Sequence, residues 1–271
     1  PAFAPTADTK VSVTKIRIPA NWAQIMEGQI DSSHSSSLHS SDMVPAKVEG
    51  AAADDKAWYR PSTDRSPRMQ VERTDYGFHY AAIRHPIKQP ALNEYFRVTE
   101  YIAPYTCLIP PNSSYNVTTV VVPIDDENSM FNFIAWGGES CPDTAEWRRF
   151  NHSVPGEDLD ENWVSKRQPE NKFLQDRTLM KQGNFTGVPG IPNQDIIMWV
   201  SMGAIVDRTT DRLGASDMAV VEFRKLMVDA AKTMEVTGEA LGSKSALKHT
   251  QIRSYEGVHS KETDWKTLCR N

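Results

Sequence analysis

The chain has 271 residues, 39% of them hydrophobic and 24% charged, which suits one globular domain with a sizeable core. Its formal net charge is -5 and its Lys and Arg residues are scattered, so the sequence predicts neither nucleic acid nor an anionic membrane as a partner. No stretch reaches the roughly 20 apolar residues of a membrane span, and the opening residues lack the apolar centre of a signal peptide, so we expect a cytoplasmic protein.

The first elements expected along the chain are a strand and a helix. Apolar and polar residues alternate over residues 10–18, which is typical of a half-buried strand, and Pro19 ends the pattern. From Asn21 to Ile30 apolar residues recur at three- and four-residue steps, so one face of a helix should point to the core. Residues 45–75 are rich in charge, proline and serine, and we expect mainly a long loop there.

A series of strands is expected next. Strand-like runs separated by turn residues lie at residues 70–73, 77–84, 96–103, 115–123 and 130–136. Because no helix is expected between them, their sheet should be antiparallel. Residues 141–175 are polar with little periodicity, so we expect surface segments with short helices there.

A long helix should follow near the end of the chain, capped by Ser216 or Asp217 and ending before Gly238. Its apolar face, which we expect to pack across the sheet, consists of Val220, Phe223, Met227, Ala230 and Met234. The whole order describes a single α+β domain covering residues 1–271.

The segment between Asp31 and His39 holds the candidate chemistry, because it places a carboxylate and two imidazoles close together. Neutral imidazole is a good metal ligand, and Asp31 can hold the other ring nitrogen of His34 one helical turn away. A spacing of five residues would splay the two rings apart in a regular helix, so a shared ion requires an irregular turn, which the serines between them favour. The alternative is two surface histidines in a serine-rich loop, and spacing alone does not decide between them.

This segment, with the preceding N-W-x-Q-x-x-E-G run from Asn21, resembles the iron-binding segment of Rieske non-haem iron oxygenase α-subunits. Residues 184–217, which contain the pair Gln194 and Asp195, resemble the phthalate dioxygenase branch of that family. The resemblance implies a helix-grip (START/SRPBCC-like) fold, an antiparallel sheet wrapped around a long C-terminal helix. It also implies a mononuclear Fe(II) with three open positions, held by His34, His39 and Asp195.

Members of that family receive electrons from a [2Fe–2S] Rieske cluster, which is bound by C-x-H and C-x-x-H motifs that this sequence lacks. We therefore expect an N-terminal Rieske domain outside this chain, and Cys107, Cys141 and Cys269 to be free or structural thiols. The resemblance further implies a homo-oligomeric ring, trimer or stacked hexamer, in which Asp31 bridges the cluster of one subunit to the iron of the next. NAD(P)H would supply the electrons through a separate flavin and iron–sulfur reductase.

The substrate that this branch implies is an aromatic carboxylate such as phthalate, converted with O2 to a cis-dihydrodiol. Arg60 and Arg97 are the candidates to bind its carboxylates, and Ser32 is a candidate to add a hydroxyl contact. For both arginines the alternative is a surface or structural role. Two other functions stay open: a Rieske monooxygenase that removes O-methyl groups from aryl ethers, and a non-catalytic ligand-binding module on a helix-grip sheet.

Overall fold

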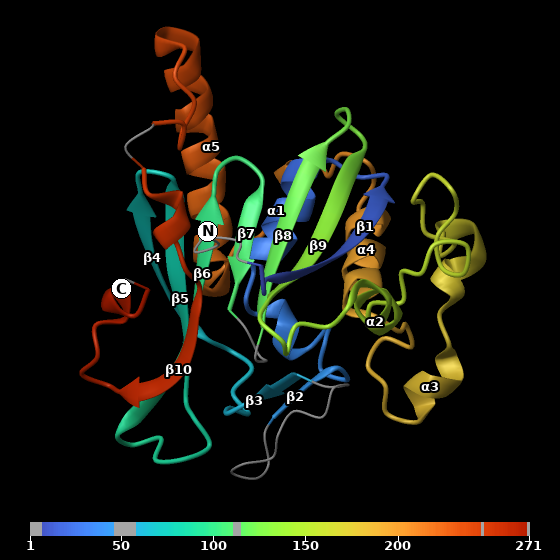
Figure 1. Ribbon diagram of the computed structural model, residues 1–271, viewed down its shortest axis with the longest axis horizontal. Helices are drawn as coiled ribbons and strands as arrows, with labels where there is room; N and C mark the ends of the chain where they lie inside the picture. The colour runs from blue at the N-terminus through green and yellow to red at the C-terminus, as the bar shows by residue number, and fades with distance from the viewer. Residues whose placement is uncertain (1–6, 46–57, 111–114, 245–246, 270–271) are drawn as a thin grey trace.

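The computed structural model describes residues 7–45, 58–110, 115–244 and 247–269. One antiparallel sheet dominates it, with the strand order β1-β9-β8-β7-β6-β5-β4 (Figure 1). In chain order its strands are β1 (Lys10–Ile18), β4 (Arg68–Thr74), β5 (Gly77–Arg84), β6 (Asn93–Ile102), β7 (Thr106–Ile109), β8 (Asn116–Pro123), β9 (Ser129–Gly137) and β10 (Tyr255–Ser260). Strand β7 pairs only with the last residues of β6, and β10 pairs with the earlier residues of β6.

The predicted antiparallel sheet is confirmed, and each predicted strand lies at its expected place. Two of its strands were not predicted. Strand β7 has only four residues, too few to display an alternation, and β10 reads Tyr-Glu-Gly-Val-His-Ser, which has no apolar period. The expected loop over residues 45–75 lies partly outside the described residues, and its described part contains β3 (Trp58–Arg60), which pairs in parallel with β2 (Met43–Pro45).

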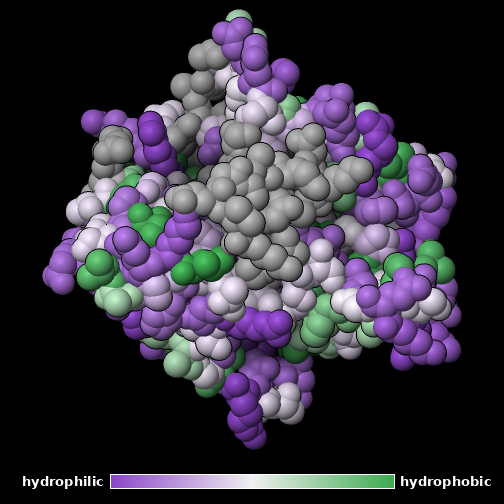
Figure 2. All heavy atoms as spheres, turned by 90° about the horizontal axis from the view of Figure 1, so that it is seen from below, coloured by the Kyte–Doolittle hydropathy of each residue, from purple (hydrophilic) through white to green (hydrophobic). Residues whose placement is uncertain are grey.

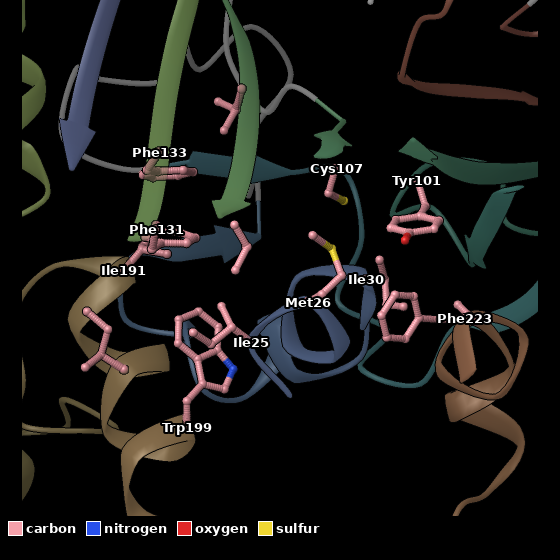
Figure 3. Close-up of a cluster of buried hydrophobic side chains, with 14 of the residues drawn as sticks. Ile25, Met26, Ile30, Tyr101, Cys107, Phe131, Phe133, Ile191, Trp199 and Phe223 are labelled. Carbon is pink, nitrogen blue, oxygen red and sulfur yellow. The ribbon is translucent and has the colours of Figure 1, made fainter. Parts of the chain in front are cut away.

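The helices are α1 (Trp22–Ile30), α2 (Thr144–Phe150), α3 (Arg177–Lys181), α4 (Ile191–Ser201) and α5 (Met218–Thr237). Helix α1 packs on β7 and β8 and contacts both α4 and α5. Figure 3 shows α1 nearly end-on, with Trp199 of α4 on one side of it and Phe223 of α5 on the other. Ile25 and Met26 of α1 point into the space between these helices and the strands. The apolar stripe predicted for α1 is therefore buried as expected.

Only the first half of α5 belongs to the core. Val220 and Phe223 are buried, whereas the expected core residue Met234 is 48% exposed, because the helix stands clear of the sheet at that point (Figure 1). The predicted helix end is confirmed, since Gly238 adopts the left-handed conformation that favours glycine. At the start of α5 Asp217 is the N-cap residue, but its carboxylate accepts from the Gly214 amide instead of the helix.

On the side shown in Figure 2, hydrophilic residues predominate among the described atoms and hydrophobic ones form small separate groups. Within the described parts of the chain, no helix has both the length and the hydropathy that crossing a bilayer would need.

Candidate metal centre and adjoining cavity

Two histidines and one aspartate meet at the end of α1. The Nε2 atoms of His34 and His39 are 3.2 Å apart, and Asp195 Oδ1 lies 3.1 Å from Nε2 of His39 and 3.6 Å from Nε2 of His34. Among the described residues this is the one group of three or more potential ligands that could share a metal ion. The structure thus brings together the side chains that the sequence analysis selected.

An irregular turn brings the two rings together. Helix α1 ends at Ile30, and a short 3-10 segment, His34–Ser36, follows it. The Leu38 amide then donates to the His34 carbonyl, and the Met43 amide donates to the His39 carbonyl. The predicted irregular turn is confirmed. The prediction that Asp31 and His34 share a helical face is wrong, because Asp31 already has an extended backbone.

The N-W-x-Q-x-x-E-G run joins α1 to α4, the helix that carries Asp195. Gln24 donates through Nε2 to the carbonyls of Trp199 and Gly203, and it accepts from the Val206 amide. Gly28 allows α1 to approach α4 closely, since a Cβ atom at this position would lie 2.3 Å from Nε1 of Trp199. The motif therefore sets the distance between the helix that precedes the histidines and the helix of the carboxylate.

The same run is tied to α5 by charge. The Glu27 carboxylate accepts hydrogen bonds from Arg208 and Arg224, at 3.1 Å and 2.9 Å, and Arg224 also pairs with Asp211. Such a network fixes the rotation of α1 about its axis.

Hydrogen bonds fix the proton positions of both imidazoles. Asp31 Oδ2 lies 3.2 Å from Nδ1 of His34, and Gln194 Oε1 lies 2.7 Å from Nδ1 of His39. Both partners can only accept, so each ring carries a proton on Nδ1, and in its neutral form it presents a lone pair at Nε2. Burial lowers the pKa of His34, but the Asp31 and Asp195 carboxylates raise it by more, and they leave it above the ordinary value.

These proton positions test whether the site suits a metal. In the neutral imidazoles, the two Nε2 lone pairs and one carboxylate oxygen converge within 3.1–3.6 Å. Ligand atoms about 2.1 Å from one ion and at right angles to each other are about 3.0 Å apart. Nitrogen and carboxylate donors on one face suit ferrous iron. The residues therefore fit a mononuclear iron ion.

A cavity of about 590 Å³, its open mouth included, adjoins the triad. Its apolar side includes Phe131 and Phe133, which stack along β9 with Ile191 beside them (Figure 3). Its polar side includes the predicted substrate residues Arg60, Arg97 and Ser32. A flat aromatic ring next to a charged group would meet matching surfaces there.

The two arginines on the wall are buried but differently paired. Arg97 forms an ion pair with Glu256 of 2.6 Å and donates to the Pro110 carbonyl. Arg60 donates to the hydroxyls of Ser35 and Ser36, and within the described residues no carboxylate pairs with it. Burial, and then the charges of Arg97 and Arg84, lower the pKa of Arg60 to about 9. Arg60 is therefore the arginine that gains most from a bound anion.

Arg84 is a third buried arginine, which the sequence analysis did not select. It donates through Nη2 to the Ser32 carbonyl at 2.8 Å, while its Nε and Nη1 atoms have no partner among the described residues. The sequence does contain a signal for the burial of Arg84. Alternate residues of a strand point to the same face, so Arg84 of β5 shares an inward face with Tyr80 and Ala82. Its charge adds to the positive potential around the cavity.

Fold and site together define a class: a helix-grip domain in which two histidines and one carboxylate form a metal centre beside a cationic cavity. Residues 1–270 match the family model described as LigXa C-terminal domain like. The chain belongs to this family, and the predicted resemblance to Rieske oxygenase catalytic domains is confirmed.

Known relatives agree with this assignment. The chain is 54% identical to the phthalate 4,5-dioxygenase oxygenase subunit of Pseudomonas putida, over 98% of this chain and 61% of that protein. It is 30% identical to the 3-chlorobenzoate-3,4-dioxygenase oxygenase subunit of Comamonas testosteroni, over 96% of this chain and 62% of that protein. The chain thus spans about three-fifths of the length of these relatives.

A solved structure shows the same fold. Pseudomonas putida CBB5 NdmA, a QL mutant with caffeine, matches with a TM-score of 0.50 at 10% identity, over 96% of this chain and 60% of that chain. The predicted helix-grip fold class is confirmed.

Proposed function

We propose that this chain is the catalytic domain of an oxygenase that inserts O2 into an aromatic carboxylate such as phthalate. One observation carries the proposal: three lone-pair donors converge beside a cavity whose wall includes a buried arginine, Arg60, without a carboxylate partner among the described residues. A metal site alone, or an anion pocket alone, would fit many proteins. Their contact within one cavity is what an oxygenase of an acidic aromatic requires.

In this proposal His34, His39 and Asp195 hold Fe(II) through Nε2, Nε2 and a carboxylate oxygen. Bound there, ferrous iron would supply the centre at which dioxygen is activated, since three ligands on one face leave the other positions open. Asp31 and Gln194 hold the two rings by their Nδ1 protons. The convergence of the three ligand atoms also argues against the alternative of a non-catalytic ligand-binding module, which would need no such triad.

The substrate is proposed to bind between the apolar and the cationic walls. Its ring would pack on Phe131 and Phe133, and a carboxylate would accept from the Arg60 guanidinium, with Arg97 and Ser32 nearby on the same wall. This arrangement would hold the ring beside the iron instead of on it. The proposed product is a cis-dihydrodiol, which takes up both atoms of O2 together with electrons and protons. Support for this class comes from the two relatives, whose names specify phthalate and chlorobenzoate.

Electrons are proposed to come from a Rieske cluster in an N-terminal domain outside residues 1–271, held by a neighbouring subunit of a cytoplasmic trimer or hexamer. A separate flavin and iron–sulfur reductase would draw them from NAD(P)H. Asp31 is the proposed bridge, because its carboxylate contacts His34 Nδ1 and is still 22% exposed. The relatives' description as oxygenase subunits supports a system of several components.

A ligand panel on the iron-loaded protein, kept without oxygen, tests the proposal. Phthalate should raise the melting temperature more than benzoate, and dimethyl phthalate, which has the same ring without charge, should raise it least. Equal shifts with all three would contradict an anion site. Product analysis with reductase and NADH then separates a cis-dihydrodiol from the product of O-demethylation, the activity in the name of a relative at 24% identity.

A further inference from the structure

Gln194 links the iron site to a carboxylate that the proposed function does not use. Its side chain is buried, with 1% exposure, between His39 and Asp42. Its Oε1 accepts from Nδ1 of His39 at 2.7 Å, and its Nε2 donates to Oδ2 of Asp42 at 2.8 Å and to the Val188 carbonyl at 2.9 Å. Every polar atom of this amide therefore has a partner.

These partners leave no freedom in the orientation of the amide. Asp42 Oδ2 and the Val188 carbonyl can only accept, so they must face the NH2 group, and the oxygen must face His39. A carboxylate at position 194 would oppose two acceptors, and an apolar side chain would leave the buried His39 proton unpaired. A side chain that accepts at one end and donates at the other is required.

The contacts of Gln194 also join the two halves of the triad. His39 and Asp42 belong to one turn, in which the Asp42 amide donates to the His39 carbonyl at 2.9 Å. Gln194 forms hydrogen bonds with the side chains of both His39 and Asp42, and Asp195 follows it directly on α4. The distance between His39 Nε2 and Asp195 Oδ1, at 3.1 Å, is the shortest in the triad. One residue thus aligns a histidine from the turn with a carboxylate from the helix.

The second imidazole is held differently. Nδ1 of His34 meets the carboxylate of Asp31 directly, whereas the neutral amide of Gln194 separates His39 from the charge of Asp42. A carboxylate partner makes an imidazole a stronger ligand than an amide partner does. The two histidines are therefore unequal ligands.

We propose that Gln194 is a positioning residue, which fixes His39 as an Nε2 ligand in register with Asp195 and keeps the charge of Asp42 off the imidazole. This inference rests on the proposed iron site. It adds a relay, which is the chain of hydrogen bonds from Asp42 through Gln194 to His39. The direction of these hydrogen bonds sets how strongly His39 binds the metal. Asp42 takes part only through the amide.

The test measures metal affinity and not turnover. Fe(II) dissociation constants would be determined by chelator competition, and the nitric oxide complex of the ferrous protein would be examined by electron paramagnetic resonance. Gln194→Leu should weaken Fe(II) binding about 10- to 100-fold, the usual effect of losing the partner of a histidine ligand. The control is Asn193→Leu, because Asn193 is the adjacent amide on α4, equally buried at 2%, and bonds only to backbone carbonyls.

A double variant tests the polarity of the relay. Gln194→Glu with Asp42→Asn exchanges the amide and the carboxylate, so the hydrogen bonds to His39 and between the two side chains can re-form with the charge now next to the imidazole. It should bind Fe(II) more tightly than Gln194→Leu and change the spectrum of the nitrosyl complex. An affinity like that of wild type in Gln194→Leu, an equal loss in Asn193→Leu, or an unchanged spectrum in the double variant would overturn the inference. A wild-type protein that binds no Fe(II) would instead refute the proposed function.

Discussion

Arg97 and Glu256 form a buried ion pair of 2.6 Å that joins β6 to β10 on the wall of the cavity. This pair separates the roles of the two arginines that the sequence analysis grouped together. Arg97 already has a carboxylate, whereas Arg60 holds only the hydroxyls of Ser35 and Ser36 and the sulfur of Met43 among the described residues. A substrate carboxylate therefore has more to offer Arg60 than Arg97.

Replacing Arg60 should weaken binding of the acid specifically. Arg60→Met keeps much of the apolar stem but removes a charged donor, which is worth about 1.5–3 kcal/mol and predicts a rise of roughly 10- to 100-fold in KM for phthalate. The KM for a neutral aromatic of the same size should change little. Steady-state kinetics on both substrates provide the measurement, and equal changes would remove Arg60 from the substrate site.

Replacing Arg97 should affect folding as well. Arg97→Met leaves Glu256 buried without its cation, and breaking such a pair costs about 3 kcal/mol or more. Urea unfolding should show a greater loss of stability for Arg97→Met than for Arg60→Met. Glu256→Gln in the same background should recover part of the loss, because no charge is then left unpaired. No recovery would mean that the ion pair is not what stabilises this edge.

A methyl group at Gly28 should disturb the joint between α1 and α4. The added Cβ would lie 2.3 Å from Trp199 Nε1, and that indole is itself buried. Overpacking of this kind costs about 1–3 kcal/mol, so Gly28→Ala should lower both the melting temperature and the affinity for Fe(II). Gly138→Ala is the control, since nothing lies within 4 Å of its Cβ position. If Gly28→Ala behaved like this control, Trp199 would be free to move away.

His79 should make stability depend on pH. It lies between Glu100, at 3.3 Å, and Glu72, at 2.9 Å. Burial lowers the pKa of His79, but the two carboxylates raise it by more, so it stands above its ordinary value of about 6.5. A raised pKa stabilises the fold below that ordinary value, and this contribution is lost as the pH rises through the folded-state pKa.

The difference in unfolding free energy between wild type and His79→Gln should therefore be larger at pH 6 than at pH 9. Urea unfolding at both values gives the answer. A difference that is the same at both, or larger at pH 9, would show that the two carboxylates do not hold a charged imidazole there.

Parts of the fold followed from the sequence because their patterns are local. The helical stripe of α1 lies on one surface and is buried as expected, and β1 lies where its strand was predicted. The apolar residues of β1 change face along the strand, because Ile16 and Ile18 are buried whereas Val11 is 45% exposed. Helix α4 was not predicted, because its buried residues surround much of the helix and leave no clear stripe. Met234 was wrongly expected to be buried, because the apolar pattern of α5 continues after the contact of the helix with the sheet has ended.

The candidate site could also be predicted only where its pattern is local. The pattern from Asp31 to His39 and the need for an irregular turn could be inferred from the serines between the histidines. The contact of Asp195 with them depends on how α4 packs on α1, which no local pattern specifies. The ion pair of Arg97 depends on β10, a strand whose sequence lacks an alternation, so its partner Glu256 could not be foreseen.

The central claim is that His34, His39 and Asp195 bind one ferrous ion, and iron content measures it most directly. Protein loaded with Fe(II) without oxygen and then desalted should retain about one iron per chain. His34→Ala and Asp195→Ala should lose it, while His85→Ala, whose ring is 74% exposed away from the triad, should keep it. Iron retained by the first two variants at the wild-type level would contradict the account.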